Sequence, residues 1–578
     1  MKKLALLIAV TLAPLVGLHA QTIAPDGPGK DAQWATAGKQ AVGTAANTES
    51  KVWFTLAQGA MTEVYYPDVT VANVHLLQFV VVNRRTKKVE TERDDAQSSV
   101  KSLPLVYSKT LFPELVVTIR KNFSSPSSMV FEQTTRGENW WIRKTYLADP
   151  DNNTVLFTVG FTTRSKDLDL YVYFDPSIGN SGMGDTGWDE GRTLFATDGK
   201  IAAALTCGRC RLSDPVSGFL GLNDGLTQLR SNGKITNPYH RAENGNIVLT
   251  AKVTPVSLGN AQPMVFSLGL GDSPETALAS SAQSLSTGFD RVKAKYQLGW
   301  YKFLAELPDV EASYKPQFNM AAMVLHAHED KTVRGANIAS LTVPWGGGDN
   351  ANANNIGGYH LIWSRDLYQV ATAYLALGDR KAALRALDFL LKIQQKPDGS
   401  FPQNSFLDGK PFWGSLQLDE VAYPIILAHE LGVFDKETYE RHLKKAADFI
   451  VRNGPATPQE RWEEESGYSP STIAAEIAGL VCAGEIAAKN GDKAAAERYF
   501  KTADEWAANV EKWTVTRTGP YSKLPYYVRI TANGRPDAGE KIELNNGAGF
   551  FDEREVVDAG FLELVRLGIK RADDPIIA

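Results

Sequence analysis

The sequence predicts a protein of two parts, an antiparallel β-sandwich followed by a ring of α-helical hairpins. The chain has 578 residues, more than the roughly 250–300 that one hydrophobic core supports. Apolar and polar residues alternate up to about Gly299, which indicates strands, and beyond that point apolar residues recur with a period near 3.6, which indicates helices. Runs of strands followed by runs of helices are typical of separate domains.

The alternation is clearest over residues 167–174. There Leu168, Leu170, Val172 and Phe174 alternate with acidic and tyrosine side chains, which predicts one face in a core and the other in water. Many short strands without intervening helices predict a large antiparallel sandwich. Similar runs, separated by turn residues, lie at Lys51–Leu56, Leu76–Asn83, Leu115–Arg120, Thr154–Gly160, Asn246–Val253 and Met264–Leu270.

A helical connector is expected over Thr287–Leu304, with a series of helices after it. Leu443, Ala446, Ala447 and Ile450, for example, share one face of a helix at positions i, i+3, i+4 and i+7. The expected helices are Tyr314–His328, Arg365–Leu377, Arg380–Gln394, Gln417–Leu431, Lys436–Arg452, Ser471–Lys489, Lys493–Trp513 and Glu553–Leu567.

Long loops alternate with pairs of these helices. Loops of more than about 12 residues in a compact domain are usually functional. We therefore expect them to converge at one end of the ring of hairpins. They span Val333–Ile362, Gln395–Leu416, Asn453–Pro470 and Thr514–Asp552.

The first twenty residues have the pattern of a secretory signal peptide. Lys2 and Lys3 precede an apolar run that ends at Leu18, and cleavage is expected after Ala20. The run is too short to span a membrane, and no later window holds about eighteen uninterrupted apolar residues. We expect a secreted or periplasmic protein without a membrane span.

Charge and cysteine content exclude several other classes. Removing Lys2 and Lys3 lowers the formal charge from −5 by two, to −7, which argues against nucleic acid or anionic membrane as a partner. Cys207 and Cys210 form a C-x-x-C motif without a second pair of ligands for zinc, so a local disulfide is expected. Cys482 lies in an apolar helical pattern and is expected to be buried.

Three carboxylates follow Trp462 directly before a long apolar helix: Glu463, Glu464 and Glu465. A glutamate works as a general acid only where its surroundings raise its pKa, and neighbouring carboxylates with a Trp favour that. The alternative is a solvated, acidic helix entrance, because Asp and Glu are common in the first turn of a helix.

The other long loops combine aromatic rings with polar side chains. Rings cover the C–H faces of a pyranose, while carboxylate, amide and guanidinium groups bind its hydroxyls. Each motif alone has a simpler explanation, such as an ion pair at a helix entrance or a solvated face. The residues are Trp345, Tyr359, His360, Trp363, Arg365, Asp366, Trp413, Gln417, Asp419 and Glu420.

Taken in order, these motifs resemble glycoside hydrolase family 15, specifically its bacterial glucoamylase and glucodextranase branch. The resemblance includes Lys51–Leu56 and Met61–Pro67 in the sandwich and Ile338–Leu341 after it. It implies a glucodextranase-like N-terminal sandwich and an (α/α)6-type toroid that is incomplete at the C-terminus. The boundaries are 1–20 for the signal peptide, 21–285 for the sandwich, 286–313 for a helical linker and 314–578 for the partial catalytic domain.

The resemblance also implies roles for individual residues. Glu463 matches the general acid, which is expected to stay protonated, and Glu464 matches a carboxylate that binds sugar hydroxyls. Arg365 and Asp366 match the pair that holds the terminal glucose, with Asp366 expected to stay ionised beside Arg365. The aromatic wall and the polar patch beyond it are matched by Trp363, Trp413, Trp462, Gln417 and Asp419.

The family inverts configuration and so needs a general base about 6.5–9.5 Å from the acid. No segment matches the family's base loop, and nothing marks Glu543, Glu553 or Glu555 as a substitute, so the sequence is expected to lack part of the catalytic domain.

The implied function is the exo-acting release of β-glucose from non-reducing ends of α-glucans, without a cofactor for the chemistry. The alternatives are an α-1,6-specific glucodextranase, a related α-glucosidase or trehalase, and a non-catalytic carbohydrate-binding protein or inactive truncated homologue. The sequence leaves calcium binding and the oligomeric state open.

Overall fold

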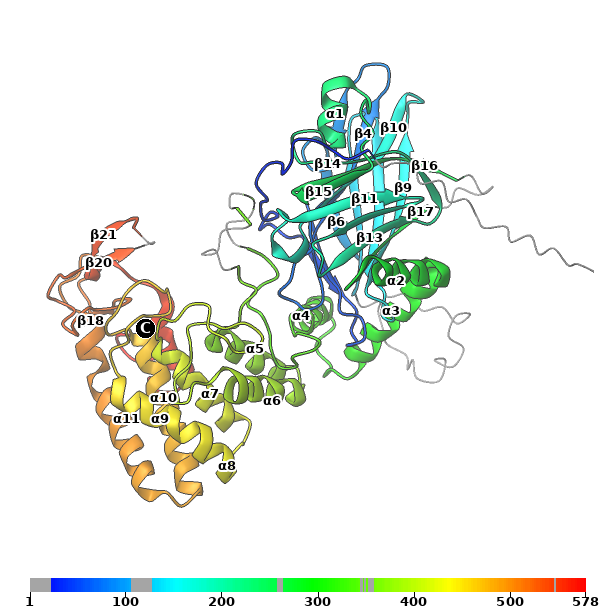
Figure 1. Ribbon diagram of the computed structural model, residues 1–578. Helices are drawn as coiled ribbons and strands as arrows, with labels where there is room; N and C mark the ends of the chain where they lie inside the picture. Colours follow the sequence, from blue (N-terminus) through cyan, green and yellow to red (C-terminus); the bar gives the residue numbers. More distant parts are fainter. Residues whose placement is uncertain are drawn as a thin grey trace, which may run out of the picture.

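A computed structural model describes residues 22–104, 127–256, 263–343, 347, 350–351, 358–544 and 547–578. The chain forms a β-sandwich followed by a helical domain that lies beside it (Figure 1). The expected signal peptide, the expected strand at Leu115–Arg120 and Trp345 lie outside the described residues.

The sandwich consists of two antiparallel sheets. One has the order β1-β2-β3-β4-β10-β16-β14, with β5 paired to β4, and the other has the order β15-β11-β12-β13-β17-β9-β8-β7-β6. The strands are β1 Ala41–Thr44, β2 Trp53–Ala57, β3 Ala60–Tyr65, β4 Val74–Asn83, β5 Val89–Thr91, β6 Gln97–Pro104, β7 Ser127–Arg136, β8 Trp140–Ala148, β9 Thr154–Thr163, β10 Leu168–Pro176, β11 Asp185–Glu190, β12 Thr193–Thr197, β13 Ala202–Cys207, β14 Cys210–Phe219, β15 Arg241–Gly245, β16 Ile247–Pro255 and β17 Met264–Gly271.

The alternating strand at residues 168–174 is confirmed as β10, but its second face is not in water. Leu170, Val172 and Phe174 face the core between the sheets, as expected. Tyr171 and Tyr173 are also buried, because α1 (Gly225–Asn232) packs on the outer face of this sheet (Figure 1). The prediction of a solvated face was wrong since periodicity within one strand does not reveal a helix inserted between two later strands.

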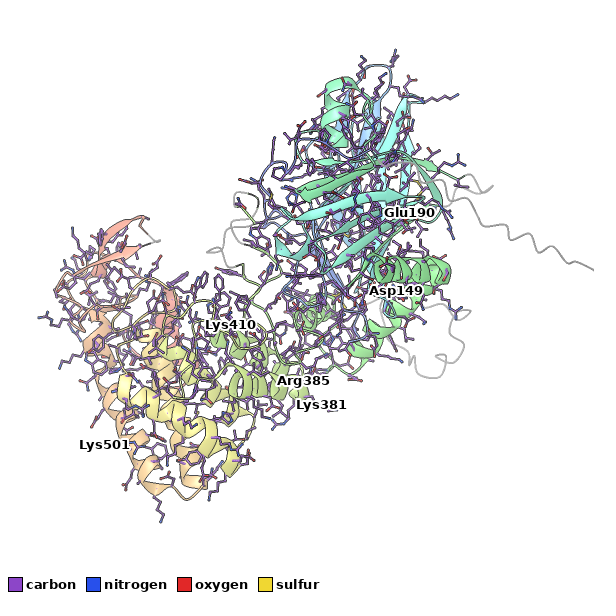
Figure 2. The ribbon with its side chains drawn as sticks, viewed as in Figure 1. Asp149, Glu190, Lys381, Arg385, Lys410 and Lys501 are labelled. Atoms are coloured by element: carbon purple, nitrogen blue, oxygen red, sulfur yellow. A yellow bond between two sulfur atoms is a disulfide. The ribbon has the colours of Figure 1, made fainter. Side chains whose placement is uncertain are left out.

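Helical structure begins before the expected connector. Helix α2 (Pro274–Thr287) starts at a capping box formed by Ser273 and Thr276. It lies against the outer face of the second sheet, beside Asp149, which accepts a 2.6 Å hydrogen bond from Ser284 (Figure 2). Gly288, with a φ of 87°, separates α2 from α3 (Phe289–Ala305).

The helical domain is a series of antiparallel helix pairs. Helices α5 and α6 form one pair, α7 packs between α5 and α10, and α10 packs along α11 (Figure 1). The helices are α4 Lys315–Ala327, α5 Ser364–Ala376, α6 Arg380–Phe389, α7 Leu418–Glu430, α8 Lys436–Thr438, α9 Lys444–Asn453, α10 Pro470–Lys489, α11 Lys493–Thr514 and α12 Glu563–Arg566; π-helical turns at Leu390–Gln394 and Tyr439–Leu443 extend α6 and join α8 to α9.

The prediction of a last helix at Glu553–Leu567 was wrong. The segment has short 3-10 turns at Glu553–Glu555 and Ala559–Leu562 and only the single turn of α12. The Asp558 side chain accepts a 2.8 Å hydrogen bond from the Gly560 amide, which starts a new turn inside the expected helix. Short pairs of strands precede it, β18 Val515–Thr516 with β19 Tyr526–Tyr527 and β20 Lys541–Leu544 with β21 Gly549–Asp552.

Of the two predictions made for the cysteines, one is confirmed and one is wrong. Cys207 and Cys210 form the expected disulfide. Cys482 is only partly buried, contrary to expectation.

Helix α10 alone, among the described helices, has the length and hydropathy of a membrane span. Of that stretch 72% is buried inside the protein, and Glu476 interrupts its apolar residues. Core helices of soluble domains have the same properties.

The long loops meet at one end of the helical domain, as predicted. Ile362 and Ser405 exchange two backbone hydrogen bonds of 3.0 Å, and Tyr468 pairs in the same way with Thr531. The Gln459 amide donates to the Leu416 carbonyl at 3.2 Å. Each loop is thus tied to the next.

Candidate active site

Glu463 lies at the centre of these loops, on a tight turn. Its φ of 66° is left-handed, which is uncommon for a residue with a Cβ and occurs at functional sites where surrounding bonds enforce it. Its amide donates to the Glu460 carbonyl at 2.8 Å, and its own carbonyl accepts a 2.9 Å bond from Gln459 Nε2. The Glu460 carboxylate accepts from the Trp462 amide at 2.9 Å.

The Glu463 side chain is oriented by Trp363, which lies at the start of α5 (Ser364–Ala376). Trp363 Nε1 donates a 2.7 Å hydrogen bond to Glu463 Oε1. Trp363 is buried and directly precedes α5, and the Ser364 hydroxyl donates at 2.8 Å to the Glu420 carbonyl at the start of α7. The first turns of α5 and α7 and the turn at Glu463 therefore form one unit.

Aromatic rings form a continuous row from this point to the surface. The Trp363 ring lies 5.6 Å from Tyr359 and 6.0 Å from Trp413, and Trp413 lies 5.3 Å from Phe412. Phe406 lies 5.7 Å from Phe412 and continues the row. The structure brings Trp363 and Trp413 together as the sequence predicted.

Trp462 lies apart from that row in its contacts. Its ring is 53% exposed, and its Nε1 donates a 2.7 Å hydrogen bond to Asp558 Oδ2. Arg461 lies over the ring and pairs with the same carboxylate at 3.1 Å. Trp462 is thus held by the segment after β21.

Arg365 is held by α7 rather than by its neighbour Asp366. Its Nη1 donates to Gln417 Oε1 at 2.6 Å and to Asp419 Oδ2 at 3.0 Å, and lies 3.4 Å from Glu420 Oε1. Burial alone would lower the pKa of Arg365, but the carboxylates of Asp419 and Glu420 raise it above its ordinary value. Gln417 and Asp419 are buried and fix this guanidinium in place.

Two opposing effects act on Asp366, which was expected to stay ionised beside Arg365. Burial raises the pKa of Asp366, and the Glu463 carboxyl raises it further, against the opposing effect of Arg365. The sequence argument considered the charge of the adjacent residue and could not include burial.

Arg529 and Glu460 belong to the site and were missed. Arg529 Nη2 binds Glu464 Oε2 at 2.8 Å and Glu460 Oε1 at 3.3 Å, so Glu464 is held by an ion pair beside Glu463. Burial raises the pKa of Glu460 to about 7, although the Trp462 amide and Arg529 oppose this. Nothing in the local sequence marks Arg529, which lies in an apolar run within the last long loop.

The remaining carboxylates considered in the sequence are held outside this unit. Glu553 is fully buried and accepts a 3.2 Å hydrogen bond from the Ala532 amide, and burial raises its pKa to about 6. The Glu543 amide donates to Glu465 Oε1 at 2.6 Å. Within the described part of the chain, no group of three or more His, Cys, Asp or Glu side chains is placed to hold a metal ion.

Comparison with known proteins places this chain in a family. Residues 24–305 match the description "Glucodextranase, domain N", and residues 318–576 match "Glycosyl hydrolases family 15". A glucoamylase from Clostridium sp. (strain G0005) is 39% identical over 561 residues, which cover 96% of this chain and 76% of that protein. An uncharacterised glycosyl hydrolase of Methanocaldococcus jannaschii, MJ1610, is 32% identical over 133 residues, or 22% of this chain and 21% of that protein.

The fold agrees with these similarities. A crystal structure of a bacterial glucoamylase complexed with acarbose superposes with a TM-score of 0.88 and 37% identity, covering 96% of this chain and 79% of that one. The two family matches together include the sandwich, the helical domain and the loop that carries Glu463. The chain belongs to glycosyl hydrolase family 15, with a glucodextranase-type N-terminal domain.

Proposed function

We propose that this protein is an exo-acting hydrolase of the glucoamylase type, in which Glu463 is the general acid. The observation that carries the assignment is the 2.7 Å hydrogen bond from Trp363 Nε1 to Glu463 Oε1, at the centre of the converging loops. The 39% identity to a glucoamylase over most of the chain favours this activity over the glucodextranase, trehalase and binding-protein alternatives.

The proposed reaction starts with the terminal glucose of an α-glucan held beside Glu463. Arg365 and Asp366 bind its hydroxyls, Glu464 binds a hydroxyl near the scissile bond, and the rings of Trp363, Trp413 and Trp462 cover its apolar faces. Gln417 and Asp419 support this set by holding Arg365.

Glu463 protonates the glycosidic oxygen as the C1–O bond breaks. Water attacks C1 from the opposite face and loses its proton to a second carboxylate, so an α-linked sugar is released as β-glucose. The reaction needs no metal or organic cofactor.

The test is the anomeric form of the product. The purified protein is incubated with maltose, isomaltose and trehalose, and released glucose is followed by proton NMR. We expect β-glucose first, with maltose the best of the three substrates. Initial α-glucose would contradict inversion, and a clear preference for isomaltose or trehalose would contradict the assignment. Binding of maltose without glucose release would favour a carbohydrate-binding role.

We also propose that the protein acts outside the cytoplasm after removal of residues 1–20. The Cys207–Cys210 disulfide supports this, because disulfides persist mainly in oxidising compartments. N-terminal sequencing of the exported protein is expected to start at Gln21.

A further inference from the structure

The N-terminal domain contacts the active-site loops at one buried histidine of those loops, His360. His360 lies between Tyr359 and Trp363 in sequence order, and its ring is 6% exposed. Tyr65, the last residue of β3, lies edge-on to the His360 ring at 5.1 Å, and Trp34 lies edge-on at 5.7 Å. Both partners belong to the N-terminal domain, so the sandwich encloses a residue of the catalytic loop.

A polar chain continues from His360 into the sandwich. His360 Nε2 lies 2.9 Å from the Tyr65 hydroxyl, which donates to Glu63 Oε2 at 3.1 Å. Lys39 Nζ pairs with the same carboxylate oxygen at 2.6 Å. Because the single hydroxyl proton of Tyr65 is used on Glu63, His360 Nε2 must donate to the Tyr65 oxygen.

The His360 ring is suited to this role. Burial and the nearby charge of Lys39 lower its pKa to about 3, so the ring is neutral at working pH. A neutral ring has one N–H, and the bond to Tyr65 assigns it to Nε2.

Backbone hydrogen bonds fix the segment that connects His360 with the active site. The Tyr359 carbonyl accepts a 2.9 Å bond from the Ser340 amide, and the Leu361 carbonyl accepts a 3.0 Å bond from the Ala339 amide. Ile362 pairs with Ser405. His360 directly follows Tyr359 in this hydrogen-bonded segment, so an anchor on His360 restricts the position of Tyr359, whose ring lies 5.6 Å from Trp363.

We propose that Tyr65 is a positioning residue for glycoside hydrolysis. Its hydroxyl holds His360, and His360 holds the segment that places the Tyr359 ring against Trp363 and the Trp363 Nε1 against Glu463. The N-terminal domain thereby contributes to the geometry of the catalytic site. This inference rests on the proposed function for its kinetic part only.

The test compares Tyr65→Phe with Tyr296→Phe. Each removes one hydroxyl from a fully buried ring, but the Tyr296 hydroxyl donates to the Met129 carbonyl at 2.9 Å, inside the sandwich. We expect Tyr65→Phe alone to lower kcat on maltose about 3- to 10-fold, the effect of one net hydrogen bond, with KM changed less than twofold. Equal kcat losses in the two variants would overturn the proposal.

A second pair of variants tests whether Nε2 of His360 is the nitrogen that donates to Tyr65. The amide nitrogen of His360→Gln can take the place of Nε2, whereas the shorter side chain of His360→Asn cannot reach Tyr65. We expect the Gln variant to keep more of the wild-type kcat than the Asn variant. Equal losses, or a better Asn variant, would contradict donation from Nε2.

Amide hydrogen exchange gives a readout that does not depend on turnover. Peptides covering residues 358–363 are expected to exchange faster in Tyr65→Phe than in wild type or Tyr296→Phe, because local opening is easier. Unchanged exchange would overturn the positioning role even in an active enzyme. Absence of glucose release by the wild type would instead count against the proposed function, and exchange would still decide the role of Tyr65.

Discussion

Trp363 and Glu463 are 100 positions apart in the chain, yet Nε1 of the first donates a 2.7 Å hydrogen bond to Oε1 of the second. The bond joins the entrance of α5 to the turn before α10. It fixes the carboxyl that we propose as the proton donor.

Trp363→Phe tests the value of this bond. The change keeps a buried ring and removes the N–H donor, so we expect kcat on maltose to fall about 10-fold, equivalent to roughly 1.4 kcal/mol. Trp506→Phe is the control, because Trp506 packs in the helical core. A kcat for Trp363→Phe equal to that of the control would show that the bond does not position Glu463.

Glu460→Gln tests the buried carboxyl beneath the same turn. Since the pKa of Glu460 in the folded protein is raised to about 7, the folded state binds a proton more tightly than the unfolded state. The resulting stability is complete below about pH 4.5 and is lost as pH rises toward 7, on the order of 3 kcal/mol.

Urea denaturation at pH 4.5 and 7.5 measures this effect. We expect the loss of unfolding free energy between the two pH values to be smaller in Glu460→Gln than in wild type. Glu505→Gln, at an exposed position of α11, serves as the control and is expected to keep the wild-type dependence. An unchanged dependence in Glu460→Gln would contradict the raised pKa.

Arg529→Met removes the cation shared by Glu460 and Glu464. Breaking a buried ion pair typically costs about 3–5 kcal/mol because a charge is left unpaired. Thermal unfolding is expected to show a marked decrease in Tm. In Arg498→Met, where a half-exposed pair with Asp448 is lost, the cost is expected to stay below about 1 kcal/mol. Similar Tm values for the two variants would be evidence against this role of Arg529.

Gly467→Ala tests the backbone of the acid-bearing loop. Gly467 has a φ of 138°, and a Cβ there would lie 2.2 Å from the Thr531 carbonyl oxygen. The change is expected to separate the two paired loops and to lower both Tm and kcat. Gly184→Ala is the control, since nothing lies within 4 Å of its added Cβ. If Gly467→Ala behaves like the control, the pairing of the two loops does not support the site.

The sequence predicted the two-domain order and the convergence of the loops because both depend on local signals. Period and turn residues mark β10, α5 and α10, and loop length marks the functional end of the helices. The prediction of a helix at residues 553–567 was wrong because Asp558 caps a new turn there. The prediction of a solvated face on β10 was wrong because α1 covers that face.

For the candidate site, the motif resemblance indicated Glu463, Arg365 and Trp413, but their partners from distant segments could not be predicted. Arg529 reaches Glu464 across 65 positions, and Tyr65 reaches His360 across 295. The behaviour of Asp366 also depends on burial, which arises only when the loops pack together.

The most direct measurement is the hydrolysis of maltose by Glu463→Gln, together with its binding of maltose. A general acid contributes about 10²–10⁴-fold, so we expect kcat to fall by at least 100-fold while the dissociation constant of maltose changes less than 10-fold. A variant that retains kcat within a few-fold of wild type would contradict the assignment of Glu463 as the proton donor.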